Sequence, residues 1–374
     1  MIKILASILP RLLSSKPFTV KKIILLSAFC AFIAFFSCNQ GKDKKTSTIS
    51  RDDSLIAMVK SVFKAIPDAP GYKKDPVLAA KVELGKMLFY DNRLSKKGNV
   101  SCNSCHNLNT FGNDNLPNSP GDDGKHGTRN SPTVFNAALQ NMQFWDGRAK
   151  DVEQQAGMPI MNPIEMGIPH KGFLIDRLSG IKMYSDMFKA AFPTEKQAIT
   201  YENLGKAIGA FERTLLTPSR FDKFMQGDKT ALTEREKAGL TSFMNSGCTS
   251  CHNGVGIGGG SLQKFGVVTD YRTLTHSKIK DEGRKAVTKK NTDKDMFKVA
   301  ALRNVQGTYP YFHDGSIANL DSAITIMGKA QLNKNLTKEE VSNINAFLKS
   351  LTGDINAEAK AIPAALQQGQ KKTK

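Results

Sequence analysis

The sequence contains Cys102-Asn103-Ser104-Cys105-His106 and, later in the chain, Cys248-Thr249-Ser250-Cys251-His252. Each is a Cys-x-x-Cys-His pentapeptide, the pattern at which haem c is attached. Two thiols at this spacing can add across the two vinyl groups of one haem, and the adjoining histidine can then bind the iron as an axial ligand. The two copies predict two covalently bound haem c groups and a chain that handles electrons.

A Cys-x-x-Cys pair can also belong to a zinc site or to a redox-active dithiol. Tetrahedral zinc needs a second ligand pair at short spacing, whereas these copies lie far apart and each ends in histidine. A thioredoxin-like dithiol accompanies a βαβ pattern, and the residues around either copy show no parallel-strand pattern. Haem attachment therefore explains the motifs best.

Residues 1–37 have the pattern of a signal peptide. A basic segment without acidic residues precedes an apolar run over 23–36, which is too short to span a bilayer. The run ends in Phe35-Phe36-Ser37-Cys38, which resembles a bacterial lipoprotein cleavage site, although Phe35 stands where an aliphatic residue is usual. The alternative is an ordinary cleaved signal with an incidental cysteine. Both predict export to the periplasm, and the first adds a membrane anchor through lipidated Cys38.

The composition near the two ends indicates little structure there. Residues 38–54 are expected to form a flexible tether, because the stretch after Cys38 is polar and rich in lysine, serine and threonine. Residues 354–374 are expected to form a tail, disordered from 357 onwards. The signal peptide, Cys38 and the haem motifs account for all 6 cysteines, so we expect no disulfide.

The formal net charge of the full chain is +19. Such basicity is common in proteins that bind nucleic acids, but an exported chain is not expected to meet them. We therefore expect no nucleic-acid partner, and a positive field that steers an acidic electron-donor protein.

Helix signals predict a mostly α fold with long loops. Thr233 and Thr337 each stand three residues before a glutamate, which is the capping box of a helix start. Asp75-Pro76 and Thr200 predict two further starts, the first helix ending near Tyr90. One haem motif in each half suggests two haem domains, over residues 55–230 and 231–353.

Several further stretches occur in series between about Lys74 and Gly353. They are Arg129-Asn130-Ser131-Pro132-Thr133-Val134-Phe135-Asn136-Ala137, Gln143-Phe144-Trp145-Asp146-Gly147-Arg148-Ala149, Leu302-Arg303-Asn304, Pro310-Tyr311-Phe312-His313-Asp314-Gly315 and Met327-Gly328. Together with the two haem motifs, and in the same order, they resemble the bacterial di-haem cytochrome c peroxidases.

This resemblance implies two cytochrome-c-like domains with a calcium ion between them, usually in a homodimer. It implies that the N-terminal haem is the low-potential site where hydrogen peroxide is reduced to two waters. The C-terminal haem would be the high-potential site at which electrons enter from a small protein, a cytochrome c or a cupredoxin.

The resemblance also assigns residues around the two irons. Met327 matches the methionine opposite His252 on the C-terminal haem, where a thioether ligand raises the reduction potential. A tyrosine at that place would instead resemble the di-haem enzymes that mature a tryptophan-derived quinone. Trp145 matches the tryptophan between the haems. Glu165 and Gln155 match the polar residues above the peroxidatic iron, where a carboxylate can move the proton that peroxide cleavage requires.

Two further features concern residues in loops. Asn130, Thr308 and Pro310 match the family's calcium site, which uses side-chain and backbone oxygens with water. The family's peroxidatic haem often carries a distal histidine seven residues before Arg129, but Asp122 stands there. Either a remodelled loop brings His126 to the iron, or the site is open. A four-residue shift moves a side chain far from a fixed iron and favours the open site.

Three function classes fit the motifs. A periplasmic cytochrome c peroxidase explains them all. A non-enzymatic di-haem electron carrier would have both irons six-coordinate and no use for Glu165 or Gln155, and a related di-haem enzyme would oxidise a different substrate.

Overall fold

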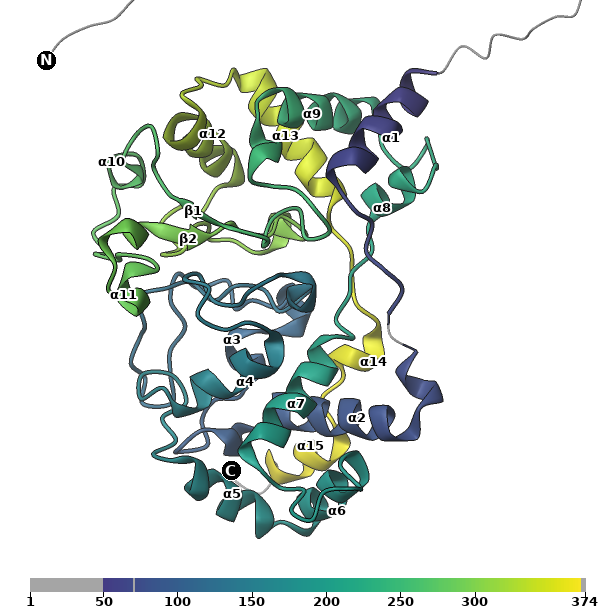
Figure 1. Ribbon diagram of the computed structural model, residues 1–374, viewed down its shortest axis with the longest axis vertical. Helices are drawn as coiled ribbons and strands as arrows, with labels where there is room; N and C mark the ends of the chain where they lie inside the picture. Colours follow the sequence, from purple (N-terminus) through teal and green to yellow (C-terminus); the bar gives the residue numbers. More distant parts are fainter. Residues whose placement is uncertain (1–49, 70, 371–374) are drawn as a thin grey trace, which may run out of the picture. The chain divides into compact units, whose positions relative to one another are not determined.

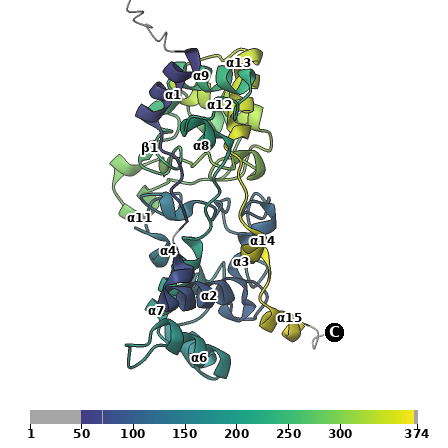
Figure 2. The ribbon, with the colours of Figure 1, turned by 90° about the vertical axis from the view of Figure 1, so that its right-hand side faces the viewer.

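The computed structural model describes residues 50–69 and 71–370 (Figure 1; Figure 2). Helices and long loops dominate, which confirms the predicted mostly α fold. The helices are α1 (Arg51–Val62), α2 (Pro76–Tyr90), α3 (Cys102–Cys105), α4 (Val152–Met161), α5 (Lys171–Ser179), α6 (Lys182–Ala191), α7 (Tyr201–Glu212), α8 (Arg220–Met225), α9 (Glu234–Asn245), α10 (Tyr271–Thr275), α11 (Lys285–Thr288), α12 (Leu320–Leu332), α13 (Lys338–Ser350), α14 (Ala357–Lys360) and α15 (Ala364–Gln370).

The described part of the chain contains a single sheet of two short strands. β1 (Leu262–Lys264) pairs antiparallel with β2 (Met296–Lys298), and Leu262 lies opposite Lys298. No helix within the described ranges combines the length and the apolar character needed to cross a bilayer. The predicted signal peptide and Cys38 lie outside the described residues.

The helix starts that the sequence predicts are confirmed. Thr233 begins α9 and Thr337 begins α13, each with both hydrogen bonds of the capping box. The Asp75 carboxylate accepts from two N–H groups at the start of α2, and the Thr200 hydroxyl accepts from the N–H of Asn203 at the start of α7. These side chains satisfy the N–H groups that a first helical turn leaves without partners.

The described chain contains two hydrophobic cores, one near each haem motif. The first is built from α2, α4, α5, α6 and α7. The second is built from α8, α9, α12 and α13, and it also takes in α1. Both α1 and α8 precede residue 231, the predicted start of the C-terminal domain. They nevertheless pack in the second core, so the cores do not divide the chain at that boundary. In Figure 1 the helices of each core lie together.

In each core a glycine lets two helices meet backbone to backbone. A Cβ on Gly85 of α2 would lie 1.9 Å from the carbonyl oxygen of Ala207 in α7. A Cβ on Gly239 of α9 would lie 1.8 Å from the carbonyl oxygen of Asn343 in α13. The two haem motifs are therefore supported by the same kind of glycine-mediated helix pair.

The expectation of a disordered tail is wrong over 357–370. Ile355 is buried in the first core, and α14 and α15 follow it. Tyr90 donates its hydroxyl to the carbonyl oxygens of Ala359 and Lys360, both at 3.0 Å. The polar composition suggested disorder, but a few apolar side chains and these hydrogen bonds hold the segment on the N-terminal core.

Candidate functional site

Each haem motif folds into one tight turn. The N–H of His106 donates to the carbonyl of Cys102, and the N–H of His252 donates to that of Cys248, both at 2.9 Å. Ser101 and Ser104 form a capping box around the first turn. This local folding brings the two thiols and the imidazole of each motif to the wall of one cavity.

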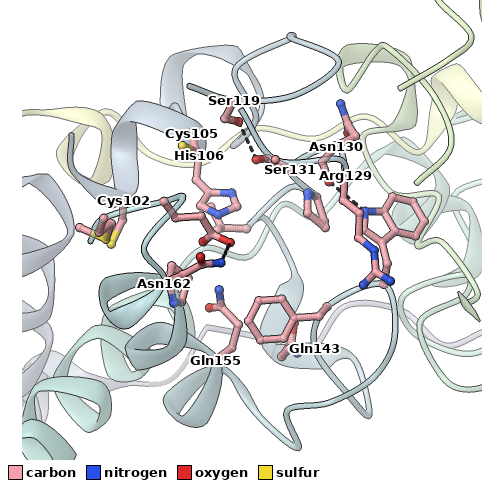
Figure 3. A pocket seen from close by; sticks show the side chains of 18 of the residues that line it. Cys102, Cys105, His106, Ser119, Arg129, Asn130, Ser131, Gln143, Gln155 and Asn162 are labelled. Carbon is pink, nitrogen blue, oxygen red and sulfur yellow. Dashed lines mark hydrogen bonds between the residues drawn. The ribbon is translucent and has the colours of Figure 1, made fainter. Parts of the chain in front are cut away.

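The N-terminal cavity has a volume of about 370 Å³. Cys102, Cys105 and His106 line it, together with Glu165 and Gln155, which the sequence assigned to the peroxidatic site. Figure 3 shows His106 and the two cysteines with Gln155 and Asn162 around this space. The structure thus brings together residues from α3, α4 and the loop after α4.

The C-terminal cavity has a volume of about 190 Å³. Cys248, Cys251 and His252 line it, and so does Met327 from α12. Most of the other lining side chains are aromatic or aliphatic. The predicted axial pair therefore shares one largely apolar cavity.

Both cavities have the donor set that haem c requires. Burial lowers the pKa of His106, and it lowers that of His252 to about 4, so both imidazoles are neutral near pH 7. The neutral ring is the form that binds a metal. Within the described chain, Nδ1 of each ring is buried without a hydrogen-bond partner. Paired thiols and a neutral imidazole fit a covalent haem in each place.

Glu165 is held by a short loop after α4. Asn162 donates its side-chain N–H to Oε1 of Glu165 at 2.7 Å, and the backbone N–H of Glu165 donates to the Asn162 carbonyl at 3.0 Å. Burial raises the pKa of the Glu165 carboxyl, while the charge of Arg148 and the Asn162 hydrogen bond oppose that rise. A carboxyl with a raised pKa can exchange a proton more readily near neutral pH.

Asp122, which replaces the expected histidine, is bound into its own loop. The residue is 5% exposed. The carboxylate accepts from the Ser95 hydroxyl at 2.8 Å and from the N–H groups of Lys97 and Asn99 at 2.5 and 2.9 Å. Its own N–H donates to the Glu165 carbonyl at 2.7 Å. Asp122 therefore positions the Glu165 loop and is not among the residues that line the cavity.

His126 lies on the wall of the N-terminal cavity and is also exposed to solvent. Its Nδ1 lies 3.0 Å from the carbonyl oxygen of Asn118. A carbonyl only accepts hydrogen bonds, so this contact selects the tautomer with the proton on Nδ1 and the lone pair on Nε2. The ring is thus chemically able to bind a metal through Nε2.

Trp145 lies where the cavities meet. It lines both haem cavities and a third cavity of about 80 Å³. Its indole packs edge-on against His313, with the ring centres 6.3 Å apart. Its position between the haems stays a prediction, which its place on the wall of both haem cavities supports.

The third cavity contains all three residues assigned to calcium. Asn130, Thr308 and Pro310 come from distant segments and line the same space. The Asn130 side-chain N–H donates to the Leu116 carbonyl at 2.7 Å, which leaves Oδ1 as the amide oxygen available to a cation. Oxygen ligands of this kind suit calcium.

Sequence reasoning did not single out Asn162, Arg148 or Lys298, although each lines the N-terminal cavity. Asn162 stands three residues before Glu165, a spacing at which side chains of one turn can meet. Lys298 is the charged residue in the apolar stretch Phe297-Lys298-Val299. A lysine between apolar residues of a strand is the one available signal, because lysine is rarely buried unless a partner compensates its charge.

Comparisons with known proteins agree with this geometry. The model of the family described as di-haem cytochrome c peroxidase matches residues 79–230, and that of cytochrome c matches residues 236–352. Cytochrome c551 peroxidase of Nitrosomonas europaea is 48% identical over 281 residues, which cover 75% of this chain and 82% of the relative. The protein of the same name from Pseudomonas aeruginosa is 45% identical over 310 residues, covering 82% and 88%.

A solved structure is similar over most of its length. It is the crystal structure of a MauG-like protein associated with microbial copper homeostasis. It superposes with a TM-score of 0.69 at 28% identity, covering 80% of this chain and 97% of that protein. The predicted architecture of two cytochrome-c-like domains is thereby confirmed.

Proposed function

This chain belongs to the di-haem cytochrome c peroxidase family and is an oxidoreductase, and from this premise we propose that it reduces hydrogen peroxide to water in the periplasm. Electrons come from a small redox protein, a cytochrome c or a cupredoxin. The balanced reaction takes one peroxide, two electrons and two protons to two waters. The observation that carries the proposal is that Glu165 and Gln155 share a cavity with the Cys102-Cys105-His106 set.

The linings of the two cavities support different roles for the two haem sites, electron transfer at one and peroxide reduction at the other. His252 and Met327 line the C-terminal cavity, whose walls are largely apolar; these two residues would hold a haem iron there, and a thioether ligand would suit electron transfer at high potential. The N-terminal cavity is lined by His106 and by polar side chains such as Glu165 and Gln155, which suit a substrate site. When bound, haem c supplies the iron chemistry that reduces peroxide at one site and accepts electrons at the other.

The protein's own contribution at the peroxide site is to orient the substrate and to move a proton. Asn162 occupies Oε1 of Glu165, so Oε2 is the oxygen that takes a proton from one peroxide oxygen and returns it to the other. Gln155 offers an amide that can orient the peroxide by hydrogen bonding. General acid–base groups of this kind contribute roughly 10²–10⁴-fold to a rate.

Three further parts of the proposal concern assembly. A calcium ion bound by Asn130, Thr308 and Pro310 would fix the loops beside Trp145, and the shared cavity of these residues supports it. The lipoprotein-like signal supports anchoring to a membrane through Cys38. The family resemblance supports a homodimer.

The test of the function is steady-state consumption of hydrogen peroxide with a reduced small cytochrome c as donor. We expect turnover, and two covalent haems per chain in a pyridine haemochrome assay. Two haems without peroxide consumption would instead identify an electron carrier. One haem or none would contradict the cofactor assignment itself.

A further inference from the structure

Lys298 is a buried lysine that the proposed mechanism does not use. It lies in β2 and is 5% exposed, and its backbone N–H donates to the carbonyl of Trp145 at 2.7 Å. It lines the two haem cavities and the third cavity. A buried ammonium group is costly unless a partner compensates its charge.

The described residues supply no acidic partner for Lys298. Its Nζ donates to Oε1 of Gln140, a neutral amide, and no ion pair is formed within the described ranges. The charge of Asp146 acts to raise the pKa of Lys298. That carboxylate already accepts from Arg129 at 2.5 Å and from Arg148 at 2.7 Å. Burial lowers the pKa of Lys298 to about 8, which fits a cation without an anion beside it.

The position of Gln140 shows to which cavity the ammonium end belongs. Gln140 lines the N-terminal haem cavity and the third cavity, but it is not among the residues of the C-terminal cavity. Through this contact Lys298 extends from a strand of the C-terminal half to the side shared by the N-terminal haem cavity and the third cavity. A haem brings two propionate carboxylates, which are the anions such a site lacks.

We propose that the ammonium group of Lys298 binds a propionate of the N-terminal haem and raises the reduction potential of that haem. The inference rests on the proposed function only in requiring that haem is bound. A cation near the haem stabilises the reduced form, because reduction adds a negative charge. Because Lys298 also bonds to the backbone of Trp145, the same residue ties the electron path to the haem that receives the electrons.

The test uses the intact di-haem protein and spectroelectrochemical titration of each haem. Lys298→Met removes the charge, Lys298→Arg keeps it, and Lys264→Met removes an exposed lysine of the neighbouring strand as a matched control. In Lys298→Met we expect both haems to be retained and the N-terminal haem to be harder to reduce, by about tenfold in its equilibrium constant. That change corresponds to about 59 mV for a one-electron couple. Lys298→Arg and Lys264→Met should titrate like the wild type.

Other results of the titration would contradict the role of Lys298. Equal shifts in Lys298→Met and Lys264→Met, no shift in either, or a shift confined to the C-terminal haem would overturn the inference. If Lys298→Met fails to bind haem, Lys298→Gln provides a polar variant without charge. Loss of the N-terminal haem in both neutral variants with retention in Lys298→Arg supports a charge that holds a carboxylate. Loss of the N-terminal haem in all three variants, including Lys298→Arg, shows that haem binding depends on the shape of the lysine side chain and not on its charge. That outcome refutes the pairing with a propionate. Haem stoichiometry of the wild type tests the proposed function separately.

Discussion

Trp145 donates its indole N–H to the backbone carbonyl of Asn130, 2.9 Å away. The backbone N–H of Asn130 in turn donates to the carbonyl of His313 at 2.7 Å. The tryptophan between the haem cavities is thus joined through one residue to the proposed calcium site and to the C-terminal haem cavity.

Replacing Trp145 with Phe should slow electron transfer between the haems. The variant loses the indole and its hydrogen bond to Asn130, and we expect a stability loss of about 1 kcal/mol from that bond. Both haems and both potentials should stay near those of the wild type. Stopped-flow reduction of the N-terminal haem through the C-terminal haem measures the rate. Wild-type transfer in this variant would remove Trp145 from the electron path.

Replacing Glu165 with Gln should lower kcat by roughly 10²–10⁴-fold, because Gln cannot take the proton from peroxide. The variant keeps the size and polarity of the side chain, so haem spectra and potentials should not change. Glu153→Gln is the matched control, since Glu153 pairs with Arg213 instead of lining the cavity. Loss of haem from Glu165→Gln would indicate a structural role, and full turnover would show that another group moves the proton.

The pH dependence of turnover should report the Glu165 carboxyl. Peroxide cleavage needs the deprotonated form first, so kcat/KM should fall as the pH drops through the pKa of Glu165. Burial raises that pKa above the usual glutamate value. The fall in kcat/KM on the acid side of the pH profile (the acid limb) should therefore lie at a higher pH than an ordinary glutamate would give. Asn162→Asp keeps the oxygen that accepts from the Ile164 N–H but removes the donor to Glu165. We expect it to move the acid limb to still higher pH. An unmoved limb would mean that Glu165 is not the titrating group.

Replacing Met327 with His should lower the reduction potential of the C-terminal haem and slow electron entry. A thioether ligand favours ferrous iron more than an imidazole does, and Met327 shares the cavity of His252. Redox titration of the variant measures the change. Met158→Leu is a control at an exposed methionine. A C-terminal haem with wild-type potential in Met327→His would exclude Met327 as a ligand.

The oxidised enzyme should show high-spin ferric haem at the N-terminal site and react with peroxide without prior reduction. Asp122 is committed to its loop by four hydrogen bonds through its side chain and N–H. His126 is exposed and bonded to Asn118, which favours an open sixth position. Electron paramagnetic resonance measures the spin state. A low-spin spectrum that becomes high-spin in His126→Ala would identify His126 as a distal ligand.

Features that depend only on interactions between neighbouring residues could be predicted from the amino-acid sequence. Haem attachment depends on thiols and a histidine within five consecutive residues, so two motifs were enough to predict two covalent haems. The capped starts of α2, α7, α9 and α13 depend on hydrogen bonds that span two or three residues. These could be predicted because no distant contact is required to form them.

The assembly of the cavities depends on contacts between distant segments, which exist in the folded chain alone. Lys298 meets Gln140 across 158 positions of sequence, and no periodicity predicts such a contact. The role of Asp122 as a loop anchor depends on three side-chain acceptor contacts with the turn from Ser95 to Asn99. Residues 357–370 form helices because Tyr90 and the first core offer this segment partners. Burial and charge pairing are properties of the packed chain, and they alone reveal which charged residues lack a partner.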